Sequence, residues 1–211
     1  MKNYLTEFIG TFFLVLTVGL SVLSGTPLAP LAIGGSLMVM VYMGGHISGG
    51  HYNPAVSLAV LLRGKLPGKE FVPYLLAQLA GAVAASLLVY AIMGRTFAPA
   101  PAENATALGS LLVEILYTFA LCLVVLNVAT SEQTKGNSYY GLAIGFTVVV
   151  AAFAGGSVSG GAFNPAVGLG PLLVQAALGN GSLAHAWLYL VGPFLGGALA
   201  AGVFRIQEAA A

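Results

Sequence analysis

The chain consists of long apolar runs separated by short polar connections. A membrane-spanning helix needs about 20 mainly apolar residues. Six runs are long enough, and the pattern therefore predicts six membrane helices. They cover residues 4–23, 27–45, 71–93, 108–130, 139–156 and 183–205.

Two further apolar stretches are too short to cross a bilayer. Residues 46–62 and 157–179 each begin with glycines, contain Asn-Pro-Ala and continue apolar for only about ten residues, which is typical of re-entrant segments. If the N-terminus is cytoplasmic and both short segments return to their own side, every Lys and Arg except Arg95 falls on the cytoplasmic side. Cytoplasmic loops are rich in Lys and Arg, so we expect both termini in the cytoplasm.

The composition excludes whole classes of protein. Only 6% of the 211 residues are charged and 58% are apolar, whereas soluble proteins carry about 25% charged residues. We therefore expect an all-α integral membrane protein that spans the bilayer several times. The net charge of +1 provides no basic patch for a nucleic acid.

The two halves of the chain repeat the same pattern. Asn-Pro-Ala recurs 111 positions later, and Glu7 in the first predicted helix has a counterpart in Glu114. Three crossings in each half invert the second half relative to the first, so we predict an inverted 3+3 repeat. The whole chain, 1–211, then forms one channel domain with repeats 1–95 and 108–211 joined by an external loop, 96–107. The two motif copies are Asn53, Pro54, Ala55 and Asn164, Pro165, Ala166.

Each Asn-Pro pair has the chemistry of a helix start. Asn is a preferred N-cap, and Pro is favoured at the first helical position. One pair alone would indicate only a helix start, but an inverted repeat brings both starts to the middle of the bilayer. Each Asn oxygen is expected to cap its own helix, which leaves both N–H donors of each amide free to face a cavity. Two helix N-termini, each equivalent to about half a positive charge, repel cations there. The pattern predicts a passive channel for small uncharged solutes.

The chain closely resembles the aquaporin (major intrinsic protein) family along its whole length. The resemblance is carried by Gly-His-Ile-Ser-Gly-Gly-His-Tyr-Asn-Pro-Ala-Val at residues 45–56 and by Ser-Gly-Gly-Ala-Phe-Asn-Pro-Ala at residues 159–166. It implies a right-handed bundle of six transmembrane helices with two re-entrant half-helices, one pore per protomer and a homotetramer in the lipid bilayer. It implies water and small neutral solutes as partners, and no enzyme activity, cofactor or metal.

The sequence departs from the family at the outer constriction. Most members have an arginine after the second Asn-Pro-Ala, and here the residue is Val167. By spacing, the other constriction positions are Ile33, Ala152 and Gly161. Such a filter is apolar and wide, and resembles plant vacuolar-membrane or metalloid-permeable relatives. Losing a guanidinium removes several donors and a charge, so we predict passage of water and at least one larger neutral solute. The candidates are hydrogen peroxide, ammonia, urea, glycerol and undissociated metalloid acids.

Four other polar residues need an explanation. Glu7 and Glu114 lie inside predicted spans, where charges are costly. We expect them to brace the N–H groups of the re-entrant segments, with a proton-coupling pair as the alternative. His46 and His51 are expected to bond loop backbone beside the cytoplasmic vestibule; a pH-sensitive gate is the alternative, and a metal site lacks a third ligand.

Other functions stay open on the sequence alone. A secondary transporter also uses inverted repeats and broken helices, but would need ion-coupling groups at the midplane. A water-only channel and a closed structural membrane protein are further alternatives. No nucleophile–base pair or metal-ligand cluster favours an enzyme.

Overall fold

The computed structural model describes residues 1–178 and 181–209, and this part of the chain is helical. Residue 179, where the second re-entrant segment was expected to end, and residues 210–211 of the second repeat lie outside the described residues. The helices are α1 (Lys2–Leu23), α2 (Ala29–Ser48), α3 (Pro54–Leu62), α4 (Gly68–Met93), α5 (Ala107–Thr130), the 3-10 turn η1 (Glu132–Thr134), α6 (Tyr140–Ser159), α7 (Pro165–Ala177) and α8 (Ala186–Ala209).

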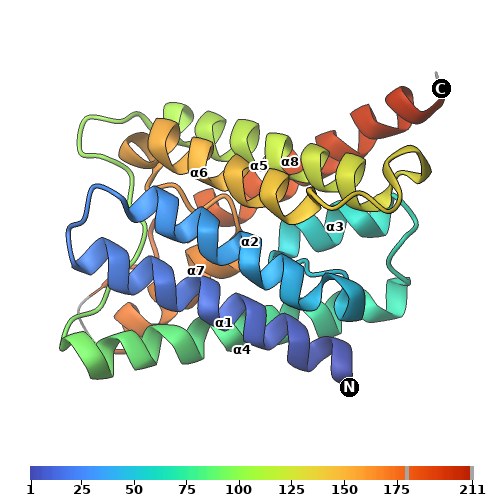
Figure 1. Ribbon diagram of the computed structural model, residues 1–211. Coiled ribbons are helices and arrows are strands. Elements are labelled where there is room, and N and C mark those ends of the chain that lie inside the picture. Colours follow the sequence, from blue (N-terminus) through green and yellow to red (C-terminus); the bar gives the residue numbers. More distant parts are fainter. Residues whose placement is uncertain (179–180, 210–211) are drawn as a thin grey trace.

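Six of the described helices are long and apolar enough to cross a membrane: α1, α2, α4, α5, α6 and α8. The other two, α3 and α7, have 9 and 13 residues and lie inside the bundle, one in each half of its length (Figure 1). The predicted fold class, six transmembrane helices with two half-helices, is confirmed.

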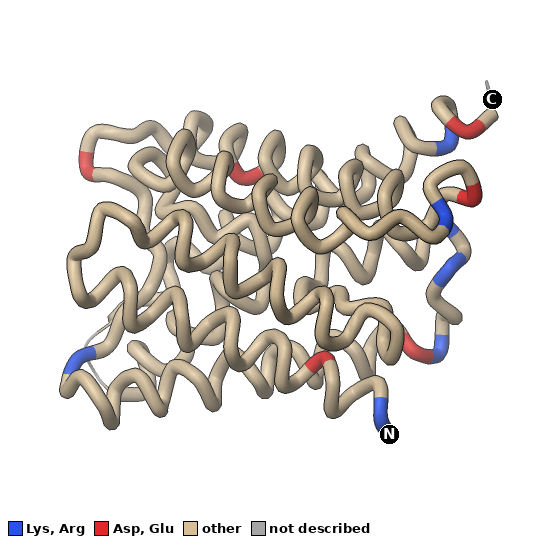
Figure 2. Tube along the Cα trace, in the orientation of Figure 1, with Lys and Arg blue, Asp and Glu red and all other residues tan. Residues whose placement is uncertain are grey.

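The two halves of the chain use the same order of elements. Two long helices, a half-helix and a third long helix make up α1 to α4, and the same order returns in α5 to α8. Both termini lie at the same end of the bundle (Figure 1), which we call the terminal end. Lys and Arg gather at that end (Figure 2).

Several helix boundaries differ from the predicted ones. α2 and α6 continue to Ser48 and Ser159, three residues beyond the predicted ends, so residues 46–48 and 157–159 are helical rather than part of the re-entrant segments. The helices stop at Gly49 and Gly160, whose φ angles of 93° and 88° are left-handed and favour glycine. α8 begins three residues later than predicted and continues four residues beyond residue 205.

Glycines let the long helices approach closely at equivalent places in the two halves. A Cβ atom at Gly81 of α4 would collide with the carbonyl oxygen of Phe8 in α1, and one at Gly196 of α8 would lie 2.5 Å from the carbonyl oxygen of Ile115 in α5. Small residues at membrane helix interfaces have this packing role.

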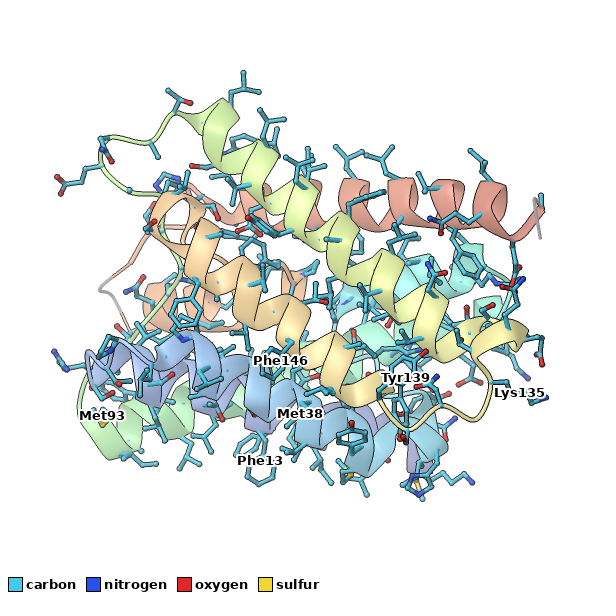
Figure 3. All side chains as sticks on the ribbon, turned by 45° about the horizontal axis from the view of Figure 1, so that its top comes forward. Phe13, Met38, Met93, Lys135, Tyr139 and Phe146 are labelled. Carbon is cyan, nitrogen blue, oxygen red and sulfur yellow. The ribbon has the colours of Figure 1, made fainter. Side chains whose placement is uncertain are left out.

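The outer surface of the bundle is apolar. Phe13, Leu116 and Phe146 expose 45%, 59% and 49% of their surface, and the Phe13 ring points away from the bundle (Figure 3). Exposing such an apolar surface to water is unfavourable, whereas exposing it to the hydrocarbon core of a bilayer is not. The chain is therefore an integral membrane protein with several spans.

Gly196→Ala should lower the melting temperature of the purified protein in detergent, because the added methyl group collides with the α5 backbone. We expect a loss of about 1 to 3 kcal/mol, as for other overpacked positions. Gly202→Ala on the same helix is the control, because a Cβ there meets nothing within 4 Å and alanine favours helix. Equal melting temperatures for the two variants would contradict the packing.

Candidate functional site: a central pore

The two half-helices begin with the same capping geometry. Asn53 precedes α3, and its side-chain oxygen accepts a hydrogen bond from the backbone N–H of Ala55 at 2.8 Å. Asn164 precedes α7 and accepts from Ala166 at 2.9 Å and from Val167 at 3.4 Å. Both asparagines are extended, with φ of −156° and −161°, as is typical of N-cap residues. A proline, which is favoured at the first helical position, follows each of them.

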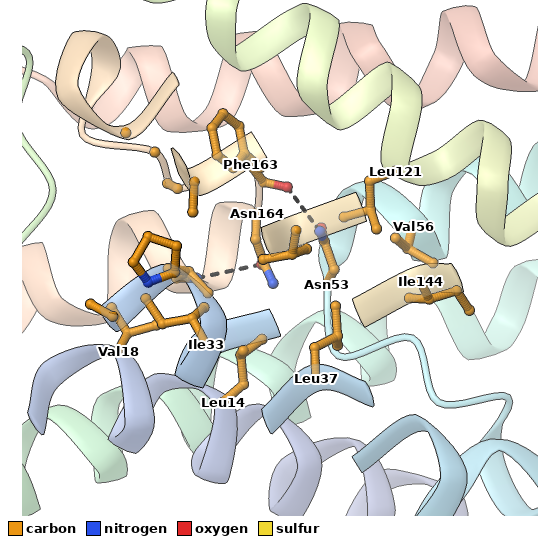
Figure 4. Close-up of a pocket in the computed structure, with 18 of the residues that line it drawn as sticks. Leu14, Val18, Ile33, Leu37, Asn53, Val56, Leu121, Ile144, Phe163 and Asn164 are labelled. Atoms are coloured by element: carbon orange, nitrogen blue, oxygen red, sulfur yellow. Dashed lines mark hydrogen bonds between the residues drawn. The ribbon is translucent and has the colours of Figure 1, made fainter. Parts of the chain in front are cut away.

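Each asparagine also bonds the loop that precedes the opposite half-helix. Asn53 Nδ2 donates to the carbonyl oxygen of Phe163 at 2.9 Å (Figure 4), and Asn164 Nδ2 donates to that of Tyr52 at 2.8 Å. The expectation that both N–H donors of each amide are free was therefore wrong. One donor of each amide holds the two half-helix starts together, and one is left for the cavity.

Two buried carboxylates receive the backbone donors of these loops. Glu7 accepts from the N–H groups of His51 and Tyr52 at 3.0 and 2.7 Å, and Glu114 accepts from those of Ala162 and Phe163 at 3.0 and 2.7 Å. Both glutamates are fully buried. Unpartnered N–H groups at this depth are costly, so these bonds stabilise loops that are not helical.

The loops turn sharply into the asparagines. Tyr52 and Phe163 have φ of 49° and 50°, a left-handed conformation that is costly for residues other than glycine. The hydroxyl groups of Ser48 and Ser159 add a bond of 2.7 Å each to Glu7 and Glu114. The carboxylates thus hold a strained backbone in the same shape in both halves.

A cavity of about 290 Å³ passes the two asparagines. One wall is formed by apolar side chains of α1, α2, α5 and α6, and the opposite wall by the two loops and the half-helix starts (Figure 4). Among the described residues, those that line it include no Asp, Glu, Lys or Arg. The four positions predicted by spacing all line this one cavity: Ile33, Ala152, Gly161 and Val167.

Two more cavities, of about 450 and 460 Å³, lie toward the terminal end. Lys65, in the connection from α3 to α4, lines both of them. It lies 3.6 Å from Glu132 in η1, which also pairs with Lys135 at 3.1 Å. Lys135 and then Lys65 lower the pKa of Glu132, so this exposed carboxylate is ionised at neutral pH.

The two histidines differ from the expectation that both bond loop backbone. His46 is not in the re-entrant loop: it lies in the last turn of α2, is exposed, lines one of the terminal-end cavities and has no side-chain hydrogen bond to a described residue. His51 is buried in the loop, but its Nδ1 lies 3.0 Å from the Ser57 hydroxyl of α3 rather than from backbone.

The sequence analysis missed part of this polar framework. Gln78 of α4 is fully buried and donates from Nε2 to Glu7 at 2.8 Å and to Ser57 at 3.0 Å. The signal was a single amide in the middle of an apolar span. Tyr74 and Tyr189 donate to the carbonyl oxygens of Ser48 and Ser159 at 2.8 and 2.6 Å. The matching positions of these two tyrosines in the repeats could have indicated that they have the same structural role.

The fold and the cavity define a helical membrane protein whose bundle encloses a cavity at the meeting point of two half-helices. Residues 1–204 match the family described as Major intrinsic protein. The chain is 36% identical to Aquaporin NIP1-4 of Oryza sativa subsp. japonica, over 98% of this chain and 77% of that protein. It is also 36% identical to Glycerol uptake facilitator protein-like 6 of Lactiplantibacillus plantarum, over 98% of each.

A solved structure has the same fold. The aquaglyceroporin from Plasmodium falciparum superimposes with a TM-score of 0.84 at 24% identity, covering 96% of this chain and 94% of that one. The chain belongs to the major intrinsic protein family of channels for water and small solutes, which are not enzymes.

Glu114→Gln should destabilise the protein, because glutamine replaces one acceptor oxygen with an NH2 group that faces donors from Ser159 or the loop backbone. We expect a loss of about 2 kcal/mol or more, typical of a buried bond to a charged group. The melting temperature in detergent measures it. Glu103→Gln is the control, because Glu103 lies in the exposed connection before α5 and its replacement removes the same charge without removing a hydrogen bond to the loop backbone. An equal fall in melting temperature for this control would contradict the stabilising role of Glu114.

Proposed function

We propose that the chain is a passive channel for water and for at least one larger neutral solute. The observation that carries the proposal is the single cavity that passes both asparagines and is lined by Ile33, Ala152, Gly161 and Val167. None of these four side chains carries a hydrogen-bonding group, and Gly161 carries no side chain at all. We infer that together they form the selectivity filter and that it admits solutes wider than water.

The solute class follows from the two walls of the cavity. A solute that is part polar and part apolar can place its carbon or non-bonding surface against the aliphatic wall and its polar groups against the loops and asparagines. Glycerol, urea, hydrogen peroxide, ammonia and undissociated metalloid acids all fit this description. The similarity to a protein named a glycerol uptake facilitator-like protein supports glycerol as the first solute to test.

Cations are excluded by the centre of the pore. The starts of α3 and α7 meet there, each equivalent to about half a positive charge. A cation that enters loses hydration and finds no carboxylate among the described residues that line the cavity. The same lack of ion-coupling groups argues against a secondary transporter.

We further propose the setting in which the channel works. The concentration of Lys and Arg at the terminal end (Figure 2) supports cytoplasmic N- and C-termini by the positive-inside rule. By family resemblance the chain acts as a single channel domain in a homotetramer, with one pore in each protomer and the apolar outer faces against lipid.

Stopped-flow measurements on proteoliposomes test the proposal. We expect fast water flux and, in a panel of glycerol, urea, ammonia, hydrogen peroxide and boric acid, at least one solute well above empty liposomes, with no flux of sodium or protons. Fast water with rejection of the entire panel would identify a water-only channel, and saturable ion-dependent flux a transporter. No flux at all would identify a closed structural protein.

Val167→Arg should narrow the solute range, because a guanidinium fills part of the outer cavity and adds a charge that binds water. We expect glycerol or urea permeability to fall by about tenfold or more, equivalent to about 1.4 kcal/mol of barrier, with a smaller change for water. Val167→Met, which has a long side chain without donors or charge, controls for bulk. If the arginine variant passes the same range of solutes as the wild-type protein, Val167 is not part of the selectivity filter.

A further inference from the structure

The inverted repeat gives the four proposed filter residues a counterpart on the other side of the asparagines. The offset of 111 positions that relates the two Asn-Pro-Ala motifs also relates α2 and its loop to α6 and its loop. The four filter residues, which we call the outer set, are Ile33, Ala152, Gly161 and Val167. Their counterparts, which we call the terminal-side set, are Ile144, Val41, Gly50 and Val56. The two sets differ at one position only, where Val41 replaces Ala152.

The boundary between two cavities falls at the terminal-side set. Ile33 and Ile144 lie on opposite sides of the two asparagines (Figure 4). The central cavity passes all four residues of the outer set. On the terminal side, Ile144 lines both the central cavity and a terminal-end cavity, whereas Val41 lines the terminal-end cavity and not the central one. The passage is therefore continuous at the outer set and interrupted at the terminal-side set.

Each residue of the terminal-side set is also less exposed than its counterpart. Val41 and Ile144 expose only 1% and 4% of their surface, whereas Ala152 and Ile33 are half-buried. The glycine and valine pairs differ in the same direction. A residue that lines a pore is exposed only where there is room for water beside it, so there is less room at the terminal-side set.

The helices that carry these side chains cannot easily move apart or rotate. Gly34 of α2 and Gly145 of α6 are repeat counterparts, and a Cβ atom at either would lie 2.5 Å from the carbonyl oxygen of the other. Valine and isoleucine in a helix are also restricted at χ1, so Val41 and Ile144 do not readily swing aside. The size of these side chains therefore determines the width of the passage.

We propose that the terminal-side set is the size-limiting filter of the pore and that Val41 determines its width. This inference rests on the proposed channel function. The outer set then acts as a wider first filter and admits solutes that the terminal-side set still excludes. Selectivity in such pores depends on diameter as well as on hydrogen-bonding groups and charge, and the side chains of both sets have neither of the last two. Water is narrow enough to pass both sets.

A reciprocal exchange of one residue tests which set limits the flux. Val41→Ala gives the terminal-side set the residues of the outer set. Glycerol permeability should then rise about threefold or more, since one or two methyl groups decide between solutes in a fitted apolar site; if the wild-type protein excludes glycerol, the variant should admit it. Ala152→Val should leave glycerol permeability nearly unchanged, because it makes the outer set only as narrow as the set that already limits the flux. The double variant should return to the wild-type value.

The measurement is stopped-flow permeability of proteoliposomes to water, glycerol and erythritol, normalised to monodisperse reconstituted protein. Val15→Ala is the matched control, because Val15 is fully buried in α1 and lines none of the three cavities; it should change no permeability. Val41→Thr keeps the width of valine and should keep the wild-type range of solutes. If Val41→Ala does not yield monodisperse protein, Ile144→Val removes one methyl group from the same set and should raise glycerol permeability in the same way.

The outcomes distinguish this inference from the channel proposal. If the wild-type protein conducts but Val41→Ala behaves like Val15→Ala, the terminal-side set does not limit the flux and the channel stands. A fall in glycerol permeability in Ala152→Val would make the outer set the limiting one. If Val41→Thr raises glycerol permeability as much as Val41→Ala does, or if water rises in proportion to glycerol, Val41 does not select by width. If the wild-type protein passes no solute above empty liposomes, both proposals fail.

Discussion

The reciprocal bonds between each asparagine and the opposite loop are the interaction on which the rest of the structure depends. Asn53 and Asn164 each use one oxygen to start a half-helix and one N–H to hold the carbonyl of the other half. The two short helices enter from opposite ends and neither crosses the bundle, so these bonds join them directly where they meet. The same amides line the cavity, so the bonds that join the half-helices lie beside the passage that we propose for the solute.

This joint has a cost that the surrounding helices offset. A non-helical loop inside a membrane protein exposes backbone donors that water cannot reach, and left-handed Tyr52 and Phe163 add strain. Glu7 and Glu114 offset the first cost by accepting two backbone N–H groups each. A carboxylate is well suited because it only accepts, and it accepts at both oxygens.

The sequence predicted the parts that depend on local pattern and on the repeat. The lengths of the spans, the Asn-Pro helix starts and the equivalence of Glu7 and Glu114 in the two repeats all follow from the spacing of residues in the sequence. The predicted fold class was confirmed. The sequence could not show where amide protons go: both asparagines were expected to keep two free donors, because the opposite carbonyl acceptor is more than 100 residues away. It also missed Gln78, whose bonds to Glu7 and Ser57 come from three separate helices. Tertiary hydrogen bonds of this kind leave no period in the sequence.

The repeat is symmetric in fold and asymmetric in chemistry. Both halves need a brace, a cap and a close helix crossing, and these are geometric requirements that the two copies meet with the same residues. Solute selection does not require the same residues in both halves, because a solute passes the two ends of a channel one after the other and each end can select differently. Here the loop that precedes α7 offers the methyl group of Ala162, whereas the loop that precedes α3 offers the imidazole of His51, which lies 3.0 Å from Ser57 Oγ. Residues that agree between the halves report on folding but can also line the cavity, as Gly161 and Val167 do with their counterparts Gly50 and Val56. Residues that differ, such as His51 and Ala162, give the two ends of the cavity different chemistry.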